Sequence, residues 1–354
     1  MSPFGDSKRA RRIRLIITTI TFAALAFLIF SIRRQIWQTF NSLGQVNSFA
    51  LLLIIPLQFF NYHSYTNLYR GMFKILGIKV PYRSMFRIAL EINFINNIFP
   101  SGGLSTFSYI GTRMRTFGIS ASQSTLIQMM RFVMVFLSFQ VLLFVGLFLL
   151  AIDGKANDIM ILITGSLATL LFVLTALFTF VIGNEKRIHS FVVPLARAMN
   201  KLIHIFRPKN PETINLVRAK NIFSNIHNNY EVLRKNYRQL KKPFIYSLFA
   251  NLTEILTLYS VYIAFDKWVN PGAVIIGYAI ANFAGIIAVH LPGGVGVYEG
   301  LMTGVMAAAG VPAAITLPAT VMYRVLAQSL QLPPGYFFYS RFMRSKYANK
   351  PKPS

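Results

Sequence analysis

The chain has 354 residues, of which 54% are hydrophobic and 13% charged, and its 36 Lys and Arg against 10 Asp and Glu give a net charge of +26. Its apolar residues lie in blocks of about 20, the length that crosses a bilayer as a helix. The composition therefore predicts an all-α polytopic membrane protein and excludes a soluble globular domain. Cysteine is absent, which excludes a disulfide framework, a thiolate nucleophile and a cysteine-bound metal.

Six apolar segments are each long enough for a full crossing. They are residues 15–32, 49–69, 123–150, 159–182, 243–265 and 314–339. The first follows a basic cluster like that of a secretory signal, but no small-residue cleavage site comes after it. We interpret it as an uncleaved anchor.

Most of the 36 basic residues fall in segments that share one side of the membrane in this arrangement. The exceptions are Arg33, Arg34, Lys155 and Lys267 in the opposite loops and Arg131 and Arg324 within spans. Because positively charged loops stay in the cytoplasm, we expect a bacterial or archaeal inner-membrane protein with both termini cytoplasmic. The basic surface then faces anionic lipid, and the lack of a soluble basic domain argues against nucleic acid as a partner.

Two glycine-rich turns interrupt the apolar sequence. They are Pro100-Ser101-Gly102-Gly103-Leu104 and Pro292-Gly293-Gly294-Val295-Gly296. At membrane depth such a turn exposes backbone groups that hydrocarbon cannot satisfy, so it must be buried in protein or line a wet cavity. The flanking segments 85–99, 104–112 and 297–309 are too short to cross, whereas 273–291 is nearly long enough. We predict two re-entrant helical hairpins that enter from opposite faces, and length alone favours re-entry over crossing for the second.

An arginine follows each turn at a similar distance, Arg131 after the first and Arg324 after the second. This weak internal repeat predicts an inverted repeat around a midplane site. We treat 1–354 as one integral membrane domain, with the first half of the repeat at about 49–182 and the second at about 243–340.

The basic segment 183–242 joins the two halves, and its apolar residues have the spacing of amphipathic helices. Two interpretations stay open. The helices lie on the headgroups or on the protein's own cytoplasmic face, or they dock a lipid-modifying enzyme. The basic tail at 345–354 contains Pro351 and Pro353 and is predicted to be disordered.

Ionisable residues inside the predicted membrane segments are the first candidates for a site, because such groups persist there only with a partner or a wet cavity. They are Glu91, Arg131, Glu254, Glu299 and Arg324. An arginine here would pair with a glutamate, Glu299 or Glu91, or hold an anionic headgroup through its guanidinium. A structural ion pair between helices is the alternative for each of them.

Neutral polar residues and the turns themselves complete the candidate set for substrate binding or gating. They are Asn97, Ser101, Gly102, Gly103, Asn282, His290, Pro292, Gly293, Gly294 and Gly296. Amide and hydroxyl groups would bond a headgroup or line a hydrated cleft, and Asn97 is equally suited to cap a broken helix. The histidines form no closely spaced set, so we expect no metal and no cofactor.

Several stretches together resemble a known family. They are Asn97-Ile98-Phe99-Pro100-Ser101-Gly102-Gly103, Arg131, Leu291-Pro292-Gly293-Gly294-Val295-Gly296-Val297-Tyr298-Glu299 and Tyr323-Arg324. They resemble the flippase-like transmembrane region of lysylphosphatidylglycerol synthases and its stand-alone relatives. In that family the membrane region is thought to move lipids with modified or glycosylated headgroups between leaflets, through a cavity formed by paired re-entrant helices. The chain ends at Ser354 without an aminoacyl-transferring domain, so we do not expect lipid lysylation.

The resemblance implies a lipid flippase or transporter, without chemistry of its own, acting on a phospholipid or a glycosylated polyprenyl-type lipid. Two alternatives remain. A polyprenyl-pyrophosphate phosphatase also combines opposed re-entrant hairpins with Glu and Arg, but its Glu/Gln-x-x-x-Glu pattern and Ser-Arg-Ser turn are missing here. A non-transporting scaffold for a lipid-modifying enzyme is the other, and it rests on the basic cytoplasmic helices.

Overall fold

The structure, a computed structural model, describes residues 46–98, 104–187, 216–287 and 296–348, with isolated positions elsewhere. The predicted span at 15–32 lies almost entirely outside the described residues, and so do both glycine-rich turns apart from Leu104 and Gly296. The described ranges consist of helices joined by short turns, and they contain no strand. The all-α prediction is therefore confirmed for this part of the chain.

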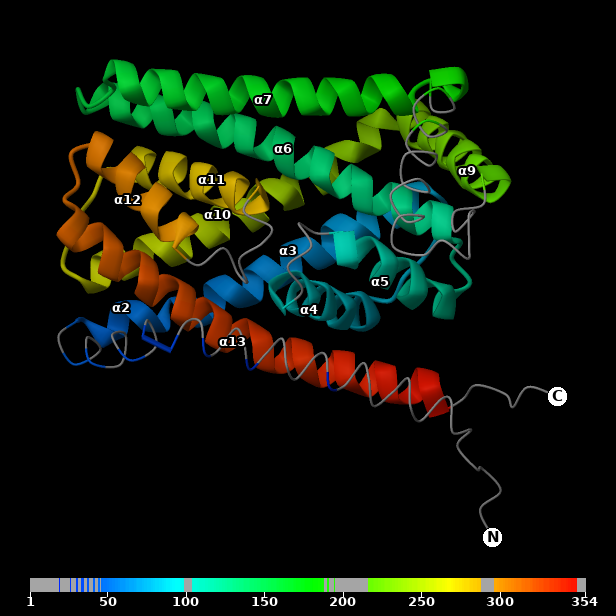
Figure 1. Cartoon of the computed structure of the whole chain (residues 1–354), viewed down its shortest axis with the longest axis horizontal. Coiled ribbons are helices and arrows are strands. Elements are labelled where there is room, and N and C mark those ends of the chain that lie inside the picture. Colours follow the sequence, from blue (N-terminus) through cyan, green and yellow to red (C-terminus); the bar gives the residue numbers. More distant parts are fainter. Residues whose placement is uncertain are drawn as a thin grey trace, which may run out of the picture.

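Two long apolar helices, α6 (Ala121–Ile152) and α7 (Asp158–Ile182), run side by side along the longest axis of the molecule (Figure 1). At the start of α6, Gln123 N–H donates to the Ser120 hydroxyl at 3.2 Å and Ser120 N–H donates to Gln123 Oε1 at 3.0 Å. This reciprocal cap satisfies backbone donors that the first helical turn leaves unpaired. Gly154, with a φ of 66°, allows the tight turn into α7.

A central pair is formed by α3 (Ile54–Ile75), which follows the short α2 (Ser48–Leu52), and α10 (Lys241–Ala264). They pack along each other, and the Asn61 amide of α3 donates to the Ala250 carbonyl of α10 at 2.8 Å. The long α13 (Ala313–Ala348) crosses near both of them. It continues to residue 348, so the tail predicted as disordered from 345 instead begins as helix.

Two short helical hairpins lie toward opposite ends of the long helices (Figure 1). One consists of α4 (Tyr82–Ile98) and α5 (Leu104–Met114), followed by the 3-10 turn η2 (Arg115–Phe117). The other consists of α11 (Pro271–Ile287) and α12 (Val297–Ala308). Their limbs match in length, with 17 residues in both α4 and α11, 11 in α5 and 12 in α12.

The hairpins also pack in matching ways, because α4 lies against α13 and α11 lies against α6. Each crossing depends on glycine. A Cβ atom on Gly272 of α11 would lie 2.2 Å from the Gly146 carbonyl oxygen of α6, and one on Gly335 of α13 would lie 2.8 Å from the Leu90 carbonyl oxygen of α4. Small residues let helix backbones approach this closely.

In the second part of the basic segment 183–242, for which amphipathic helices are predicted, the structure contains α9 (Leu216–Lys235) followed by η3 (Tyr237–Leu240). Its apolar face lies on the protein, since Ile226 and Leu233 are fully buried in the core around α4 and α5. Near the end of α7, the His227 Nδ1 atom lies 2.7 Å from the Ile182 carbonyl oxygen. The earlier part of that segment, from 188 to 215, lies outside the described ranges.

Three of the described helices are long and apolar enough to cross a membrane: α6, α7 and residues 237–264, which comprise η3 and α10. On α7 large apolar side chains such as Leu162 and Phe172 are more than 60% exposed. A surface of this kind requires lipid or another apolar partner. Helices α3 and α13 are long enough but less apolar, and α11 is shorter, so the count of six spans is not settled by length and hydropathy.

Candidate functional site

Glu299 and Arg324 form an ion pair in the interior, where Arg324 Nη1 donates to Glu299 Oε1. Only 3% of the Glu299 surface and 7% of the Arg324 surface are exposed. The pair joins the first turn of α12 to the middle of α13. The Arg324 guanidinium also lies over the Tyr298 ring, 5.1 Å from its centroid, which is favourable for a cation in a dry setting.

The position of Glu299 follows from the local sequence. Gly296, with a φ of 87°, turns the chain into α12, and its N–H donates to Glu299 Oε2 at 2.7 Å. A carboxylate in the first turn satisfies an unpaired backbone donor and interacts favourably with the positive end of the helix dipole. Both oxygens of Glu299 are thus engaged, one with the helix and one with Arg324.

Glu254, near the middle of α10, is surrounded by neutral donors. The Tyr323 hydroxyl donates to its Oε2 atom at 2.9 Å, and the amides of Gln58 and Gln331 approach its two oxygens at 3.4 Å. The two glutamines are joined to each other, with Gln331 Nε2 donating to Gln58 Oε1 at 2.7 Å. The described residues include no cation paired with Glu254.

A row of amides extends from this carboxylate along α4. Asn93 donates to Gln331 Oε1 at 3.0 Å and to the Tyr62 hydroxyl at 2.5 Å. One turn later Asn97 donates to Asn93 Oδ1 at 2.8 Å and to the Asn93 carbonyl at 3.0 Å. Asn97 therefore belongs to the polar row, and it lies one residue before the end of α4.

This polar network lies between two apolar clusters, one around each hairpin. Along α3, Ile54 belongs to the cluster of the second hairpin and Leu68 to that of the first, and Gln58 falls between them. Along α13, Gln331 falls in the same way between Ala327, which belongs to the cluster of the second hairpin, and Tyr339, which belongs to that of the first. The interior is thus apolar toward both ends and polar in the middle, where the repeat predicts a midplane site.

Arg131 of α6 lies beside the network, and its guanidinium carbon is 5.1 Å from the ring centroid of Tyr65 on α3. Its Nε atom is buried and has no hydrogen-bond partner within the described ranges, and no carboxylate there forms an ion pair with it. The residue as a whole is half-buried. It is the counterpart of Arg324 in the predicted repeat, so corresponding arginines have different surroundings.

One predicted pairing is wrong. Glu91, which is 1% exposed, is bonded to Arg113 of α5, whose Nε atom lies 2.9 Å from Glu91 Oε2, and not to an arginine of the following span. The Tyr109 hydroxyl donates to the same oxygen at 2.7 Å. This pair ties the two limbs of the first hairpin together, which is the structural role that the sequence left open for it.

Asn282 lies on α11 and is half-buried, four residues after Tyr278. The other candidates lie outside the described residues, so their surroundings are left open. They are Ser101, Gly102, Gly103, His290, Pro292, Gly293 and Gly294.

Sequence reasoning missed the glutamines that surround Glu254. The available signal was an uncharged polar side chain inside an otherwise apolar segment, since Gln58 interrupts 49–69 and Gln331 interrupts 314–339. Such amides in a membrane segment hydrogen-bond across helices. Tyr62 and Tyr323 also contribute hydroxyl groups, which the hydropathy of a largely apolar side chain does not reveal.

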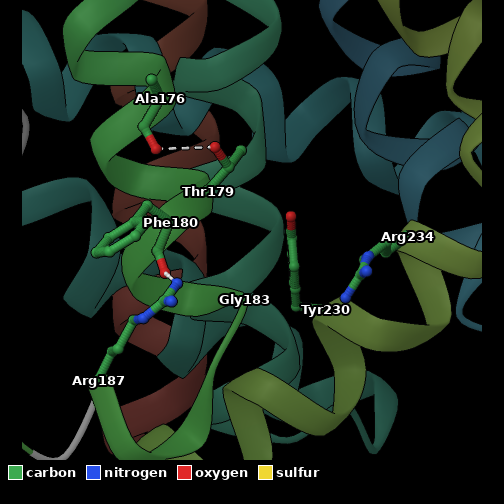
Figure 2. Close-up of a pocket in the computed structure, with 7 residues that line it drawn as sticks. All are labelled: Ala176, Thr179, Phe180, Gly183, Arg187, Tyr230 and Arg234. Carbon is green, nitrogen blue, oxygen red and sulfur yellow. Dashed lines mark hydrogen bonds between the residues drawn. The ribbon is translucent and has the colours of Figure 1, made fainter.

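A second polar feature is a surface pocket of about 500 Å³ between the end of α7 and α9. Figure 2 shows Arg187 turned back toward Phe180 on one side, with Tyr230 and Arg234 opposite. Arg187 donates to the Phe180 carbonyl at 3.3 Å, and Arg234 pairs with Glu231 at 2.9 Å. Burial raises the pKa of the Tyr230 hydroxyl. Both arginines of this pocket are therefore engaged by neighbouring groups.

In the part of the chain that the structure describes, no group of three or more His, Asp or Glu side chains is arranged to hold a metal ion. The arrangement suits electrostatic and hydrogen-bond recognition. The fold and this interior define a multi-pass helical membrane protein with ionisable groups at its centre.

Comparison with known proteins identifies the family. The model of the lysylphosphatidylglycerol synthase TM region matches residues 13–335, so the chain belongs to that family. The family is a membrane domain linked to lipid handling and is separate from the synthase's catalytic domain. A UPF0104 membrane protein of Methanothermobacter thermautotrophicus is similar to part of the chain, with 37% identity over 92 residues. The match covers 26% of this chain and 27% of that relative.

Proposed function

We propose that this protein moves lipids with anionic or glycosylated headgroups between the leaflets of a prokaryotic inner membrane, and that it does so without chemistry of its own. The observation that supports this most strongly is Arg131, a cation in the membrane interior with no carboxylate partner among the described residues. A cation at the bilayer centre costs at least ~2.5 kcal/mol and is retained where it serves a substrate or an ion path.

The surroundings of Arg131 suit a headgroup. A guanidinium can bond two phosphate oxygens at once, which an ammonium group cannot do with the same geometry. The amide row of Asn93 and Asn97 and the carboxylate of Glu254 belong to one hydrogen-bonded network, and they offer acceptors and donors for glycerol or sugar hydroxyl groups. In this proposal Arg131 holds the phosphate and the amides hold the polar remainder.

The proposed topology has six full crossings and two re-entrant hairpins in an inverted repeat, with both termini in the cytoplasm. Its support is the matched limb lengths, the matched packing of α4 on α13 and of α11 on α6, and the placement of the hairpins toward opposite ends. Inverted repeats with broken helices place their substrate site at the midplane.

The transport proposal is tested with purified protein in vesicles of phosphatidylglycerol and phosphatidylethanolamine that contain a trace of fluorescent phosphatidylglycerol. A membrane-impermeant quencher reports how much of the fluorescent lipid has changed leaflet. We expect the wild type to move it, Arg131→Met to have lost the activity and Arg131→Lys to retain a small part of it. The exposed pair on α9 supplies a matched control, Glu231→Gln, which should behave as wild type.

Arg131→Met strands no ionic partner, and the loss of its hydrogen bonds to Tyr65 and Tyr69 is offset by removal of a charge from the interior, so the variant should denature thermally near the wild-type temperature. Inactive but stable protein would support the proposal. Wild-type protein that moves none of the fluorescent lipids tested, including a glycosylated polyprenyl phosphate, would contradict it. A scaffold for a lipid-modifying enzyme would then be the better description.

The topology is tested by cysteines placed in this cysteine-free chain. A cysteine at Lys155, whose side chain is 52% exposed in the turn after α6, should react with an impermeant thiol reagent added to intact cells. A cysteine at Ser345, near the end of α13, should react only after the membrane is permeabilised. The reverse pattern would show the opposite orientation.

A further inference from the structure

Glu254 differs from the other acidic residues that lie inside the protein. Glu91 is paired with Arg113 and Glu299 with Arg324, whereas no cation forms an ion pair with Glu254 in the described ranges. It lies near the middle of α10, thirteen residues after Lys241 by numbering, and is half-buried. An unpaired carboxylate in such a place is costly as an anion, and the addition of one proton removes the charge.

The groups around the carboxylate can serve both protonation states. In the charged state it accepts hydrogen bonds from Tyr323, Gln58 and Gln331, two of them long at 3.4 Å. In the neutral state the carboxyl O–H needs an acceptor, and the Tyr323 hydroxyl oxygen can accept as well as donate. Neither state leaves the group without a partner.

The same groups argue against a metal cation at this position. Sodium or a divalent ion requires several oxygen ligands, but the two glutamines turn their NH₂ groups toward the carboxylate. The Gln58 carbonyl oxygen is already used by Gln331. A proton needs only one oxygen and fits this donor-rich shell.

The titratable groups that face Glu254 from neighbouring helices are almost all tyrosines, which are neutral near pH 7. Those close enough for its charge to act on their hydroxyls are Tyr62 and Tyr65 on α3, Tyr278 on α11, Tyr298 on α12 and Tyr323 on α13. The charged groups nearby are Arg131 of α6, over the Tyr65 ring, and the Glu299 and Arg324 pair, which is neutral as a unit. Helix α2 has no titratable residue, and in η3 Arg238 lies about 24 Å along the axis of α10.

A polar route connects Glu254 to the end of α4. It passes from Gln331 to Asn93 at 3.0 Å and from Asn93 to Asn97 at 2.8 Å. These residues belong to α13 and α4, while Glu254 and Gln58 belong to α10 and α3. Helices α3 and α4 belong to the first half of the chain, and α10 and α13 to the second. The hydrogen bonds around Glu254 therefore join the two halves, and they are the ones that its charge affects. A change of one proton alters contacts between the halves, which is the requirement for coupling proton binding to a conformational change.

We propose that Glu254 is the proton-binding site of a proton-coupled lipid transporter, and that Gln331, Asn93 and Asn97 line a path along which water carries protons to it. This inference rests on the proposed function, since coupling requires lipid movement. It identifies the coupling ion and the residue that binds it. Binding is the association of one proton with a carboxylate oxygen of Glu254. Release frees the same proton on the other side of the membrane.

The test uses the fluorescent phosphatidylglycerol vesicles with a pH difference imposed across the membrane. We expect the pH gradient to accelerate leaflet exchange by the wild type and by Glu254→Asp, which keeps a titrating carboxyl. Glu254→Gln should lose the response to the gradient while remaining folded, and the control Glu231→Gln should keep it. A sodium gradient at constant pH should have no effect on any of them.

Infrared spectroscopy of the purified protein supplies a readout that does not depend on transport. The wild type should show a protonated carboxyl band that changes with pH and is missing in Glu254→Gln. An ionised Glu254 throughout the mildly acidic and neutral range would overturn the proposal. So would wild-type transport that ignores the pH gradient, follows sodium, or keeps its gradient response in Glu254→Gln. Absence of lipid movement by the wild type under all conditions would instead overturn the proposed function itself.

Discussion

The ion pair between Glu299 and Arg324 provides a quantitative test of the site. Both side chains are less than 10% exposed, so neither charge can be solvated if its partner is removed. Breaking a buried pair from one side costs about 3 to 5 kcal/mol, because it leaves an uncompensated charge in a medium of low polarity. We therefore expect Glu299→Gln and Arg324→Met each to lower the free energy of unfolding by about that amount.

The double variant is expected to recover most of the loss. With both residues neutral no charge is stranded, and the amide oxygen introduced by Glu299→Gln can still accept the hydrogen bond from Gly296 N–H that the carboxylate accepts at 2.7 Å. Replacing a whole buried pair with neutral groups of similar size is often neutral or stabilising. The predicted stability of the double variant is thus within about 1 kcal/mol of the wild type.

Thermal denaturation in detergent and leaflet-resolved lipid transport should be measured together on the wild type, both single variants and the double. The exposed pair of Glu231 and Arg234 is the matched control, and its disruption should cost less than about 1 kcal/mol. If the double variant is stable but inactive, the pair acts on the substrate or on the conformational change. Recovery of both stability and transport would refute a functional role, and strictly additive losses would refute the coupling of the two residues.

Two further predictions concern packing and pH. In thermal denaturation, Gly272→Val should destabilise the protein by about 1 to 3 kcal/mol, because even a Cβ atom there would meet the Gly146 carbonyl oxygen and separate α11 from α6. Gly300 has open space around it, so Gly300→Ala is the control and should be neutral or stabilising in the same assay. Hydrogen bonds from Lys155 and Asn270 lower the pKa of the exposed Asp153 carboxyl. Its contribution to stability is present above the unfolded-state pKa of about 3.9 and is lost as the pH falls through the lower folded pKa, so Asp153→Asn should reduce the acid dependence of thermal denaturation below about pH 4. An unchanged acid dependence would contradict this.

Hydropathy predicts the boundaries of α6 and α7 well, whereas α13 runs nine residues beyond its predicted end and α3 six residues beyond its own. Residues 123–150 and 159–182 are the predicted spans, and α6 and α7 extend them by one or two residues at most ends. Helices facing lipid on a broad surface are apolar all round, so the signal there is strong. It is weaker for α3 and α13, which carry amides on the side that faces the interior and therefore fall below the hydropathy of the others.

Some of the pairings inside the site were beyond sequence reasoning. Gln58 and Gln331 are 273 residues apart and are bonded to each other, and no local pattern fixes the relative register of α3 and α13. The Glu91 pairing failed for a similar reason. Only arginines inside the predicted spans were considered as partners, whereas the hairpin geometry places Arg113 of the adjoining limb beside Glu91. The ionisable residues of the site and the pairing of Arg324 with Glu299 could be proposed from the sequence, whereas the glutamines around Glu254 and the pairing of Glu91 with Arg113 needed the tertiary fold.

The two hairpins match in limb length and packing, whereas the charges around them differ, and this difference bears on the proposed mechanism. In the second half the arginine of the long helix, Arg324, is neutralised by Glu299 at the start of the hairpin limb. In the first half the glutamate of the hairpin, Glu91, is neutralised by Arg113, which leaves Arg131 with no carboxylate among the described residues. A symmetric charge pattern would give two closed ion pairs at the centre. The observed pattern gives one closed pair, one arginine without a carboxylate partner in the described ranges and, in Glu254, one carboxylate without a cation there, and these are the groups that the proposed phosphate and proton sites use.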